Sequence, residues 1–524
     1  MILINAAEKN SLKIFQPFLP PFLPISIGFL LAETERQGIK VEHIDEYVEN
    51  DVIGLVEKYV KNFEPPYIFG FSVLTAALKN ALYRSRQLRK LYPDSVIIFG
   101  GVHPTGAPEE ILQHDHIDIV FKGEADTLLP KLYRHIKEGL DYSNIPNISF
   151  RKAGKIVHNE REKIIKDISE LPPFPYHLFS PKHYDMGIIV SSRGCPYKCI
   201  FCSNRVTTGL SYRYIPPNQV VEQLEMLNKK YGITHTNFLD DNFLVNKNRI
   251  YVLLDAIKEK DLHKKMTFDF QARGDNVNYQ ILKDLYDGGF DSISFGIETA
   301  SEDLMKIIQK GETVKECVDA VKMSKSIGYF VAATYIFGWP GETHNDRMKA
   351  AEISREAGID VVRFNNATPY PGTPLYEIAK NENRLNIVGD YENFTSVSTL
   401  IENPFKKIPF SYVPEGSTEK ELRQDILMAY LLFFFDYKRL KGVLNNPLFN
   451  LYRKKGSESS RGTSPRAKSK KNPLIFIKKI PSFVVLFFLL CVKFAELVWN
   501  VLTDRKSSIK INDFNKALKN LLPL

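Results

Sequence analysis

Residues 195–202 read Cys195-Pro196-Tyr197-Lys198-Cys199-Ile200-Phe201-Cys202, so three cysteines fall within eight positions. This C-x₃-C-x₂-C spacing offers a metal three thiolates, whereas a closed structural zinc site takes four protein ligands. An iron–sulfur cubane held by three cysteines keeps one iron open to a substrate or cofactor. We therefore expect an open cluster on Cys195, Cys199 and Cys202. A zinc site completed by His235, or a chance grouping, is the alternative.

The overall composition is that of a reduced, globular protein. The 524 residues suffice for about three domains, and a hydrophobic content of 44% supports large cores. Five cysteines, three of them clustered, do not form a disulfide scaffold and indicate a reducing compartment. Met1–Asn5 reads as a buried strand and not as a signal peptide. We expect a cytoplasmic protein.

Most of the excess of positive over negative charge lies in one segment. The formal net charge is +9, and residues 453–471 alone carry eight Lys or Arg and one acid, Glu458. The rest of the chain is therefore close to neutral. Without a basic face on the folded part, we expect no nucleic-acid partner.

Residues 1–145 alternate short apolar strands with amphipathic helices, which predicts a doubly wound α/β domain with a parallel sheet. Ligands of such sheets bind outside the carboxyl ends of the strands. The predicted strands are Met1–Asn5, Lys40–Ile44, Tyr67–Ser72, Val96–Phe99 and Ile117–Phe121.

Residues 183–400 repeat the pattern six times, after a Pro-rich linker predicted over residues 146–182. Six parallel strands with helices between them predict a partial (β/α)6 barrel whose site lies at the carboxyl ends of the strands. The predicted strands are Gly187–Ser191, Thr236–Leu239, Thr267–Gln271, Ser292–Phe295, Phe330–Phe337 and Val361–Asn365.

The cysteine spacing, the Gly296-Ile297-Glu298 segment and the turn Gly338-Trp339-Pro340-Gly341-Glu342-Thr343 together resemble the radical S-adenosylmethionine superfamily. The resemblance implies a 4Fe–4S cluster that binds S-adenosylmethionine and cleaves it to a 5′-deoxyadenosyl radical. It also implies S-adenosylmethionine contacts by strand-end residues, which are Phe201, Asp240, Asp241, Arg273, Glu298 and Gly338. Each has a structural alternative: core packing for Phe201, helix capping for the aspartates (with Asn246 as a rival cap), an ion pair for Arg273 and a helix-start carboxylate for Glu298.

The first domain resembles the cobalamin-binding domain that precedes many members of this superfamily. Gly70-Phe71-Ser72, Gly100-Gly101-Val102-His103-Pro104-Thr105 and Gly123-Glu124 carry the resemblance. It implies cobalamin contacts by Ser72, Thr75, Gly100, Gly101, His103, Thr105 and Glu124. The chain lacks an aspartate two positions before His103, so we do not expect that histidine to be a lower axial cobalt ligand. A domain that binds a nucleotide, or has lost its cofactor, is the alternative.

The C-terminal part divides into three predicted segments. Residues 401–452 form a helical extension, in which Thr418 and Glu421 have capping-box spacing. Residues 453–473 form a basic disordered linker. Residues 474–524 hold an apolar helix region whose uncharged core, Ile480–Val492, is shorter than the roughly 20 residues of a transmembrane helix. We expect peripheral contact with the cytoplasmic face of a membrane; a helix packed on protein is the alternative.

The resemblance implies an anaerobic radical enzyme that methylates an unactivated carbon of a small molecule with cobalamin as the methyl donor. It also implies an electron donor such as flavodoxin or ferredoxin. Two alternatives keep the same cofactors. One is oxidative ring formation, as in the magnesium-protoporphyrin ester cyclases, and the other is a sensor without turnover. The catalytic residues are not identified by the sequence.

Overall fold

The structure, a computed structural model, describes residues 1–8, 21–161, 165–396 and 407–434, with a few isolated positions between 492 and 513. The predicted basic linker (453–473) and nearly all of the apolar region 474–524 lie outside the described residues. Among the described residues, no helix combines the length and apolar character needed to cross a bilayer.

The N-terminal part is the doubly wound sheet that the sequence predicted. Its parallel strands run in the order β2 (Glu42–Asp45), β1 (Ile2–Asn5), β3 (Ile68–Ser72), β4 (Val96–Gly100) and β5 (Ile119–Phe121). Alternate strand residues enter two separate apolar clusters, because helices cover both faces of the sheet. These helices are α1 (Ile25–Arg36), α2 (Val52–Val60), α3 (Leu78–Leu91) and α6 (Leu128–Lys137).

The predicted linker is partly ordered sheet. Within it, β6 (Ile148–Lys152) and β7 (Lys155–His158) form an antiparallel hairpin that extends the first sheet to seven strands. The turn between them is a two-residue turn in which Ala153 and Gly154 both have positive φ, 49° and 76°. The correction is therefore that the α/β domain extends beyond residue 145.

The second sheet has the six predicted strands, all parallel. Its order is β15-β14-β13-β12-β11-β8, with β8 and β15 as edge strands that do not pair with each other. The strands are β8 (Ile188–Ile189), β11 (His235–Phe238), β12 (Thr267–Ala272), β13 (Phe290–Glu298), β14 (Phe330–Phe337) and β15 (Val361–Asn366).

Each of these strands is followed by a helix, and side-chain caps fix where most of them begin. The helices that follow the strands are α8 (Pro217–Tyr231), α9 (Lys247–Glu259), α11 (Tyr279–Asp287), α13 (Val314–Ile327), α14 (His344–Glu356) and α15 (Pro374–Asn381). The oxygen of an N-cap side chain accepts an otherwise unpaired N–H of the first turn. The N-cap residues that do so are Asn246, Asn278, Thr313, Thr343 and Thr373. Asn246 is thus the cap of α9, so neither of the aspartates that the alternative reading offered as caps fills that position.

The predicted helical extension is α17 (Glu419–Phe434), which packs on α14 and β15. The capping box is present: Thr418 Oγ1 accepts the N–H of Glu421 at 3.2 Å, and Thr418 N donates to Glu421 Oε2 at 2.8 Å. The apolar side of α17, which includes Leu422 and Ile426, joins the core of the second sheet.

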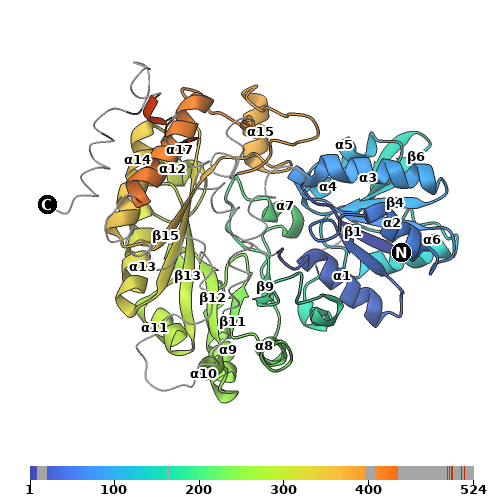
Figure 1. Cartoon of the computed structure of the whole chain (residues 1–524), viewed down its shortest axis with the longest axis horizontal. Helices are drawn as coiled ribbons and strands as arrows, with labels where there is room; N and C mark the ends of the chain where they lie inside the picture. Colours follow the sequence, from blue (N-terminus) through green and yellow to red (C-terminus); the bar gives the residue numbers. More distant parts are fainter. Residues whose placement is uncertain are drawn as a thin grey trace.

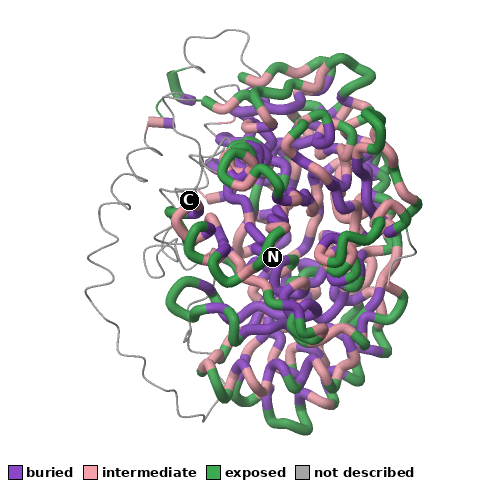
Figure 2. The backbone as a smooth tube through the Cα atoms, turned by 90° about the vertical axis from the view of Figure 1, so that its right-hand side faces the viewer, coloured by how far each residue is buried: buried purple, intermediate pink, exposed green. Residues whose placement is uncertain are grey.

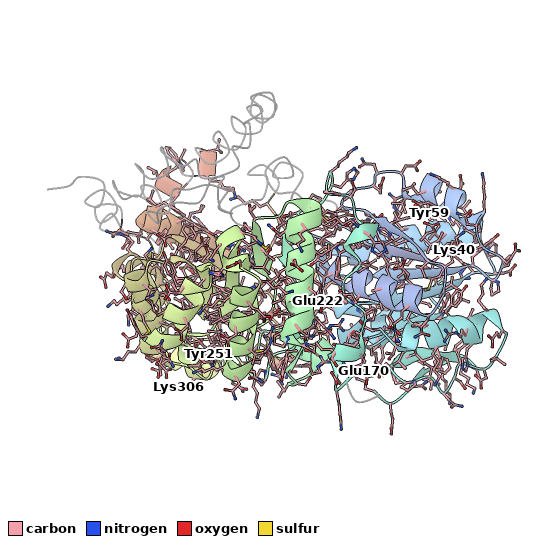
Figure 3. The ribbon with its side chains drawn as sticks, turned by 90° about the horizontal axis from the view of Figure 1, so that it is seen from below. Lys40, Tyr59, Glu170, Glu222, Tyr251 and Lys306 are labelled. Atoms are coloured by element: carbon pink, nitrogen blue, oxygen red, sulfur yellow. The ribbon has the colours of Figure 1, made fainter. Side chains whose placement is uncertain are left out.

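The two sheets lie side by side in the two halves of the molecule, with α7 (Asn204–Thr208) between them (Figure 1). Lys40 and Tyr59 mark the N-terminal end, Tyr251 and Lys306 mark the other end, and Glu222 of α8 lies between (Figure 3). Buried backbone runs through the middle of both parts, and exposed backbone lies at the periphery (Figure 2).

Candidate functional site

The three cysteines lie in a loop that follows β8 at the carboxyl end of the second sheet. The base of this loop is closed by a short antiparallel ladder between β9 (Ser192–Arg193) and β10 (Arg213–Tyr214). Gly194 begins the loop with φ +85°, and a Cβ at this position would lie 2.1 Å from Ser211 O on the returning limb. Only glycine allows the two limbs to approach this closely.

The three thiols are neighbours inside the loop. Cys199 is buried, and Cys195 and Cys202 are partly buried. Burial raises the pKa of all three thiols, that of Cys202 to about 11, and the neighbouring thiols add to the pKa of Cys202. The positive charges of nearby Lys310 and Arg273 lower the pKa of Cys199 and so oppose the effect of burial. A thiol must lose its proton to bind iron, so these cations favour the ligating form.

The zinc alternative loses its fourth ligand. His235 lies at the start of β11, while the cysteine loop follows the carboxyl end of β8. Both of its ring nitrogens are engaged, Nδ1 with Thr267 Oγ1 and Nε2 with Asp269 Oδ2, each at 2.8 Å. Within the described part of the chain, no three Cys, His, Asp or Glu side chains converge closely enough for a single metal ion. A cubane is larger than one ion, so thiolates that hold it stand farther apart.

Asp240 and Asp241, at the end of β11, occupy different environments. Asp240 is fully buried, and its two oxygens accept four hydrogen bonds of 2.6–3.1 Å from the amides and hydroxyls of Ser191 and Ser192. A carboxylate has about four such positions, so Asp240 has no capacity left for a ligand. Asp241 is exposed and accepts the N–H of Gly194 at 2.9 Å. Of the two, Asp241 is the carboxylate open to an external ammonium.

Arg273 lies beneath the cysteine loop. Its guanidinium stacks 3.6 Å from the ring centroid of Tyr197, which lies between Cys195 and Cys199. Its Nε and Nη2 donate to Asp275 at 2.9 Å, and Nη1 donates to Lys310 O at 2.6 Å. These contacts correspond to the ion-pair alternative, and they make Arg273 a support for the loop.

Glu298 ends β13 with an unsatisfied oxygen. The residue is 7% exposed, its φ is +68°, and the pairing of β13 with β14 shifts register at this point. Lys310 Nζ lies 3.6 Å from Glu298 Oε1, whereas Glu298 Oε2 is buried and has no hydrogen-bond partner. Burial raises the pKa of this carboxyl. Glu298 Oε2 therefore has capacity to accept a hydrogen bond at this strand end.

The predicted Gly-rich turn after β14 is present and packs against the cysteine loop. Gly338 and Gly341 have φ of +98° and +77°. Gly338 N donates to Glu342 Oε2 at 2.5 Å, so Glu342 supports the turn from inside. The rings of Trp339 and Phe201 lie 5.2 Å apart, and Trp339 Nε1 donates to Glu298 O at 3.2 Å. Phe201 is thus partly core packing, and it lies beside the turn.

The residues predicted to contact cobalamin gather at the carboxyl ends of β3, β4 and β5. Ser72 ends β3, Thr75 begins a short 3-10 turn, and Gly100 ends β4. At Gly101, with φ +104°, a Cβ would lie 2.9 Å from the backbone of Val73. Thr75 Oγ1 is buried without a hydrogen-bond partner.

His103 and Thr105 lie on α4 (Val102–Gly106), directly after β4. Thr105 Oγ1 donates to Gly101 O at 2.7 Å and accepts from Gly123 N at 2.9 Å, so it ties two strand ends together. His103 is fully buried, both ring nitrogens lack partners, and burial lowers its pKa to about 3. The His103 ring lies edge-on to the ring of Tyr391, with centroids 4.7 Å apart. With Thr75 Oγ1, this edge therefore holds three buried polar atoms without a hydrogen-bond partner.

Glu124 does not offer a free carboxylate to that edge. Its two oxygens accept from Arg213 Nη1 and Nη2 at 2.7 and 2.9 Å. Arg213 belongs to β10, at the base of the cysteine loop, so the structure gives Glu124 a contact between the two sheets.

The two candidate cofactor sites face each other. Helix α7, which follows Cys202, packs on α4 at the edge of the first sheet (Figure 1). The segment after β15 touches both: Leu375 N, in the first turn of α15, donates to Ile200 O at 3.1 Å, and a Cβ on Gly106 would lie 2.3 Å from Pro371 O in the preceding loop. The cysteine loop and the edge with His103 therefore lie next to each other.

Two known protein families match this chain, one over each of the two parts described above. The model of the radical SAM superfamily matches residues 189–354, and that of the B12 binding domain matches residues 20–133. This chain is a radical SAM protein with a B12 binding domain. The first match contains the cysteine loop and the ends of β11 to β14, and the second contains the ends of β3 to β5.

The similarity to relatives and to solved structures extends over most of this chain. The chain is 28% identical to an uncharacterized methyltransferase of Pyrococcus horikoshii, over 80% of this chain and 89% of the relative. It is 22% identical to the anaerobic magnesium-protoporphyrin IX monomethyl ester cyclase of Cereibacter sphaeroides, over 78% and 67%. The radical S-adenosylmethionine methyltransferase TsrM of Kitasatospora setae, solved with cobalamin and a 4Fe–4S cluster, shares the fold with a TM-score of 0.62 at 19% identity, over 72% and 77%.

Sequence reasoning missed several residues of the site. Lys310 and Glu312 lie in the segment before α13, and Lys310 Nζ is 3.5 Å from Glu312 Oε1 and 3.6 Å from Glu298 Oε1. Asp126 and Arg193 were also not predicted to be site residues. Buried charges are seldom visible in sequence, and Lys310-Gly311-Glu312 stands in the connection between α12 (Glu302–Ile307) and α13, where charged residues are ordinary.

Proposed function

We propose that this radical SAM protein is a cobalamin-dependent methyltransferase that acts on an unactivated carbon of a small molecule. The packing of α7 on α4 carries the proposal, because it brings the three cysteines and the edge of the B12 binding domain to a common site. A radical reaction at one carbon and methyl delivery to that carbon require this proximity.

The residues present fit both cofactors. Three thiols, one buried and two partly buried, with nearby cations suit a 4Fe–4S cluster with one open iron. The orphaned atoms of Thr75 and His103, with the close backbone at Gly101, suit a large polar cofactor at the edge of the first sheet. When bound, the cluster with S-adenosylmethionine supplies a 5′-deoxyadenosyl radical, and cobalamin supplies the methyl group.

The chain's own side chains would hold and orient S-adenosylmethionine. Asp241, open to solvent at the end of β11, would accept the ammonium, and Glu298 Oε2 would accept from hydroxyl groups. Phe201 would offer a ring face to the adenine, and Gly338 keeps the backbone of the turn within reach. Lys310, close to Glu298 and Cys199, places a positive charge beside these groups.

Methyl transfer is preferred to ring formation because the methyltransferase of Pyrococcus horikoshii is matched over more of its length than the cyclase, 89% against 67%. A sample with S-adenosylmethionine labelled on its methyl group separates the two outcomes. Label recovered in product supports transfer, whereas an unlabelled cyclised product supports the cyclase.

Cleavage of S-adenosylmethionine tests the enzyme itself. Anaerobically reconstituted protein with a strong reductant should release 5′-deoxyadenosine, and Cys199→Ala should lower the yield at least 100-fold. Cys317→Ala is the matched control, because Cys317 is also buried and free but lies on α13. Absence of 5′-deoxyadenosine from fully loaded wild-type protein would favour a sensor without turnover.

We also propose two partners outside the chain, an electron donor and a membrane surface. A one-electron donor such as flavodoxin or ferredoxin would reduce the cluster. Peripheral contact of residues 474–524 with a membrane rests on the sequence, because that region lies almost wholly outside the described residues.

A further inference from the structure

A network of two acids and two arginines links the B12 binding domain to the base of the cysteine loop. Asp126 Oδ1 and Oδ2 accept from Arg193 at 3.0 and 3.1 Å, and Glu124 accepts from Arg213 at 2.7 and 2.9 Å. A fifth contact of 3.5 Å joins Arg193 to Glu124. Both acids follow β5, and both arginines belong to the β9–β10 ladder.

The network is largely withdrawn from water, with side-chain exposures of 13% for Arg193, 12% for Glu124, 8% for Asp126 and 6% for Arg213. A buried ion pair adds little net stability compared with apolar side chains of the same size. A bidentate arginine–carboxylate pair, however, fixes both the distance and the angle between its partners. The network therefore contributes more to geometry than to stability.

The base of the cysteine loop needs these acids. Arg193 and Arg213 are direct partners in the β9–β10 ladder. Like charges opposite each other destabilise a ladder unless counter-charges are supplied. Glu124 and Asp126 supply them, and Arg193 also stacks 4.4 Å from the ring of Phe29 on α1. The ladder is thus completed by residues of the other half of the molecule.

The other side of the loop is held by Arg161, which follows β7, and by the close approach of Gly123. Arg161 donates to Val206 O at 3.0 Å and to Thr207 O at 2.8 Å, on α7 just after Cys202. A Cβ on Gly123, the residue before Glu124, would lie 3.1 Å from Thr207 O. The cysteine loop is therefore clamped at its base and after its last cysteine.

We propose that the pairs Glu124–Arg213 and Asp126–Arg193 are positioning residues that set the separation between the cluster and cobalamin. This inference rests on the proposed function, because it requires that both the cluster and cobalamin are bound. It gives Glu124 a role through Arg213 in place of the cobalamin contact that the resemblance implied. Misplacement of reacting groups by about 1 Å can cost on the order of 100-fold in rate.

The separation is measurable by pulsed electron paramagnetic resonance between the reduced cluster and cob(II)alamin. Glu124→Gln and Arg213→Lys should each broaden the distance distribution, since Lys keeps the charge but loses the bidentate fork. The spectrum of each cofactor alone and the metal content should not change. Asp319→Asn is the control, because it removes an exposed pair with Lys315 on α13, and it should leave the distribution narrow.

Two results would overturn the proposal. One is an unchanged, narrow distribution in both variants. The other is an at least tenfold weaker cobalamin affinity in Glu124→Gln with no change in Arg213→Lys, which would make Glu124 a cobalamin contact.

Hydrogen exchange on the cofactor-free chain provides a measurement that is independent of the reaction and of cofactor loading. In Glu124→Gln and Arg213→Lys, amides of residues 194–212 should exchange at least tenfold faster, while those of β12 to β14 keep their protection. Unchanged exchange in residues 194–212 would contradict the clamp. Because no turnover is involved, this result is separable from a failure of the methyltransferase proposal.

Discussion

At the scale of single residues, adjacent side chains with the same chemistry have different functions. Asp240 holds the backbone of Ser191 and Ser192, whereas Asp241 faces solvent beside Gly194. The sequence predicted that an aspartate at the end of this strand meets the ligand, but it could not say which one. The choice depends on the parallel pairing of β8 with β11, which brings Ser191 and Ser192 to Asp240 and is a long-range feature of the fold.

Glu342 gives a prediction for pH dependence. Burial raises its pKa from 4.5 to about 7, which Arg347 only partly offsets, and its Oε2 accepts from Gly338 N. A carboxyl whose folded pKa is raised stabilises the protein below its unfolded pKa, and this contribution is lost as the pH rises through the folded pKa. Between about pH 4.5 and 7 the free energy of unfolding should therefore fall, by on the order of 3 kcal/mol from this group.

Glu342→Gln keeps an acceptor for Gly338 but does not titrate. Urea unfolding followed by the fluorescence of buried Trp339 at pH 5 and pH 8 measures the difference. As the pH rises, the free energy of unfolding of the variant should increase relative to that of the wild type. An equal pH dependence in both proteins would show that Glu342 is not the titrating group.

At the scale of elements, the strands and helices were predictable because their apolar periodicity and caps are local signals. The parallel strands of both sheets and the capping box of Thr418 and Glu421 are confirmed. The β6–β7 hairpin was missed because its turn, Ala153-Gly154, lies within a segment assigned to a linker. The pairing of Glu124 with Arg213 could not be predicted, since no local pattern connects positions 89 residues apart.

The cysteine loop gives the prediction at this scale. Gly194→Ala should lose most of the bound iron, because the new Cβ would lie 2.1 Å from Ser211 O and must part the two limbs of the loop. Gly232→Ala is the matched control, with a similar φ of +65° but no atom within 4 Å of its Cβ. Gly232→Ala should lower the free energy of unfolding by only the roughly 1–2 kcal/mol that an alanine in a left-handed conformation costs. This variant should keep its iron. Iron and sulfide analysis of both variants tests this, and full iron content in Gly194→Ala would contradict it.

At the scale of the whole molecule, the fold places two cofactor edges against each other. Each sheet alone exposes the carboxyl ends of its strands, and α4, α7 and the loop after β15 bring these ends together (Figure 1). The order of domains and the kind of cofactors were predictable from motifs. Their mutual placement follows from buried charges and close glycine contacts between distant segments, which only the structure shows.

The most direct measurement is electron paramagnetic resonance of anaerobically reduced protein, recorded before and after addition of S-adenosylmethionine. A cluster held by Cys195, Cys199 and Cys202 alone has one iron with an open position, so the spectrum should change on addition, and it should be absent in Cys199→Ala. A reduced-cluster spectrum that S-adenosylmethionine leaves unaltered, or a protein that holds zinc and no inorganic sulfide, would contradict the account.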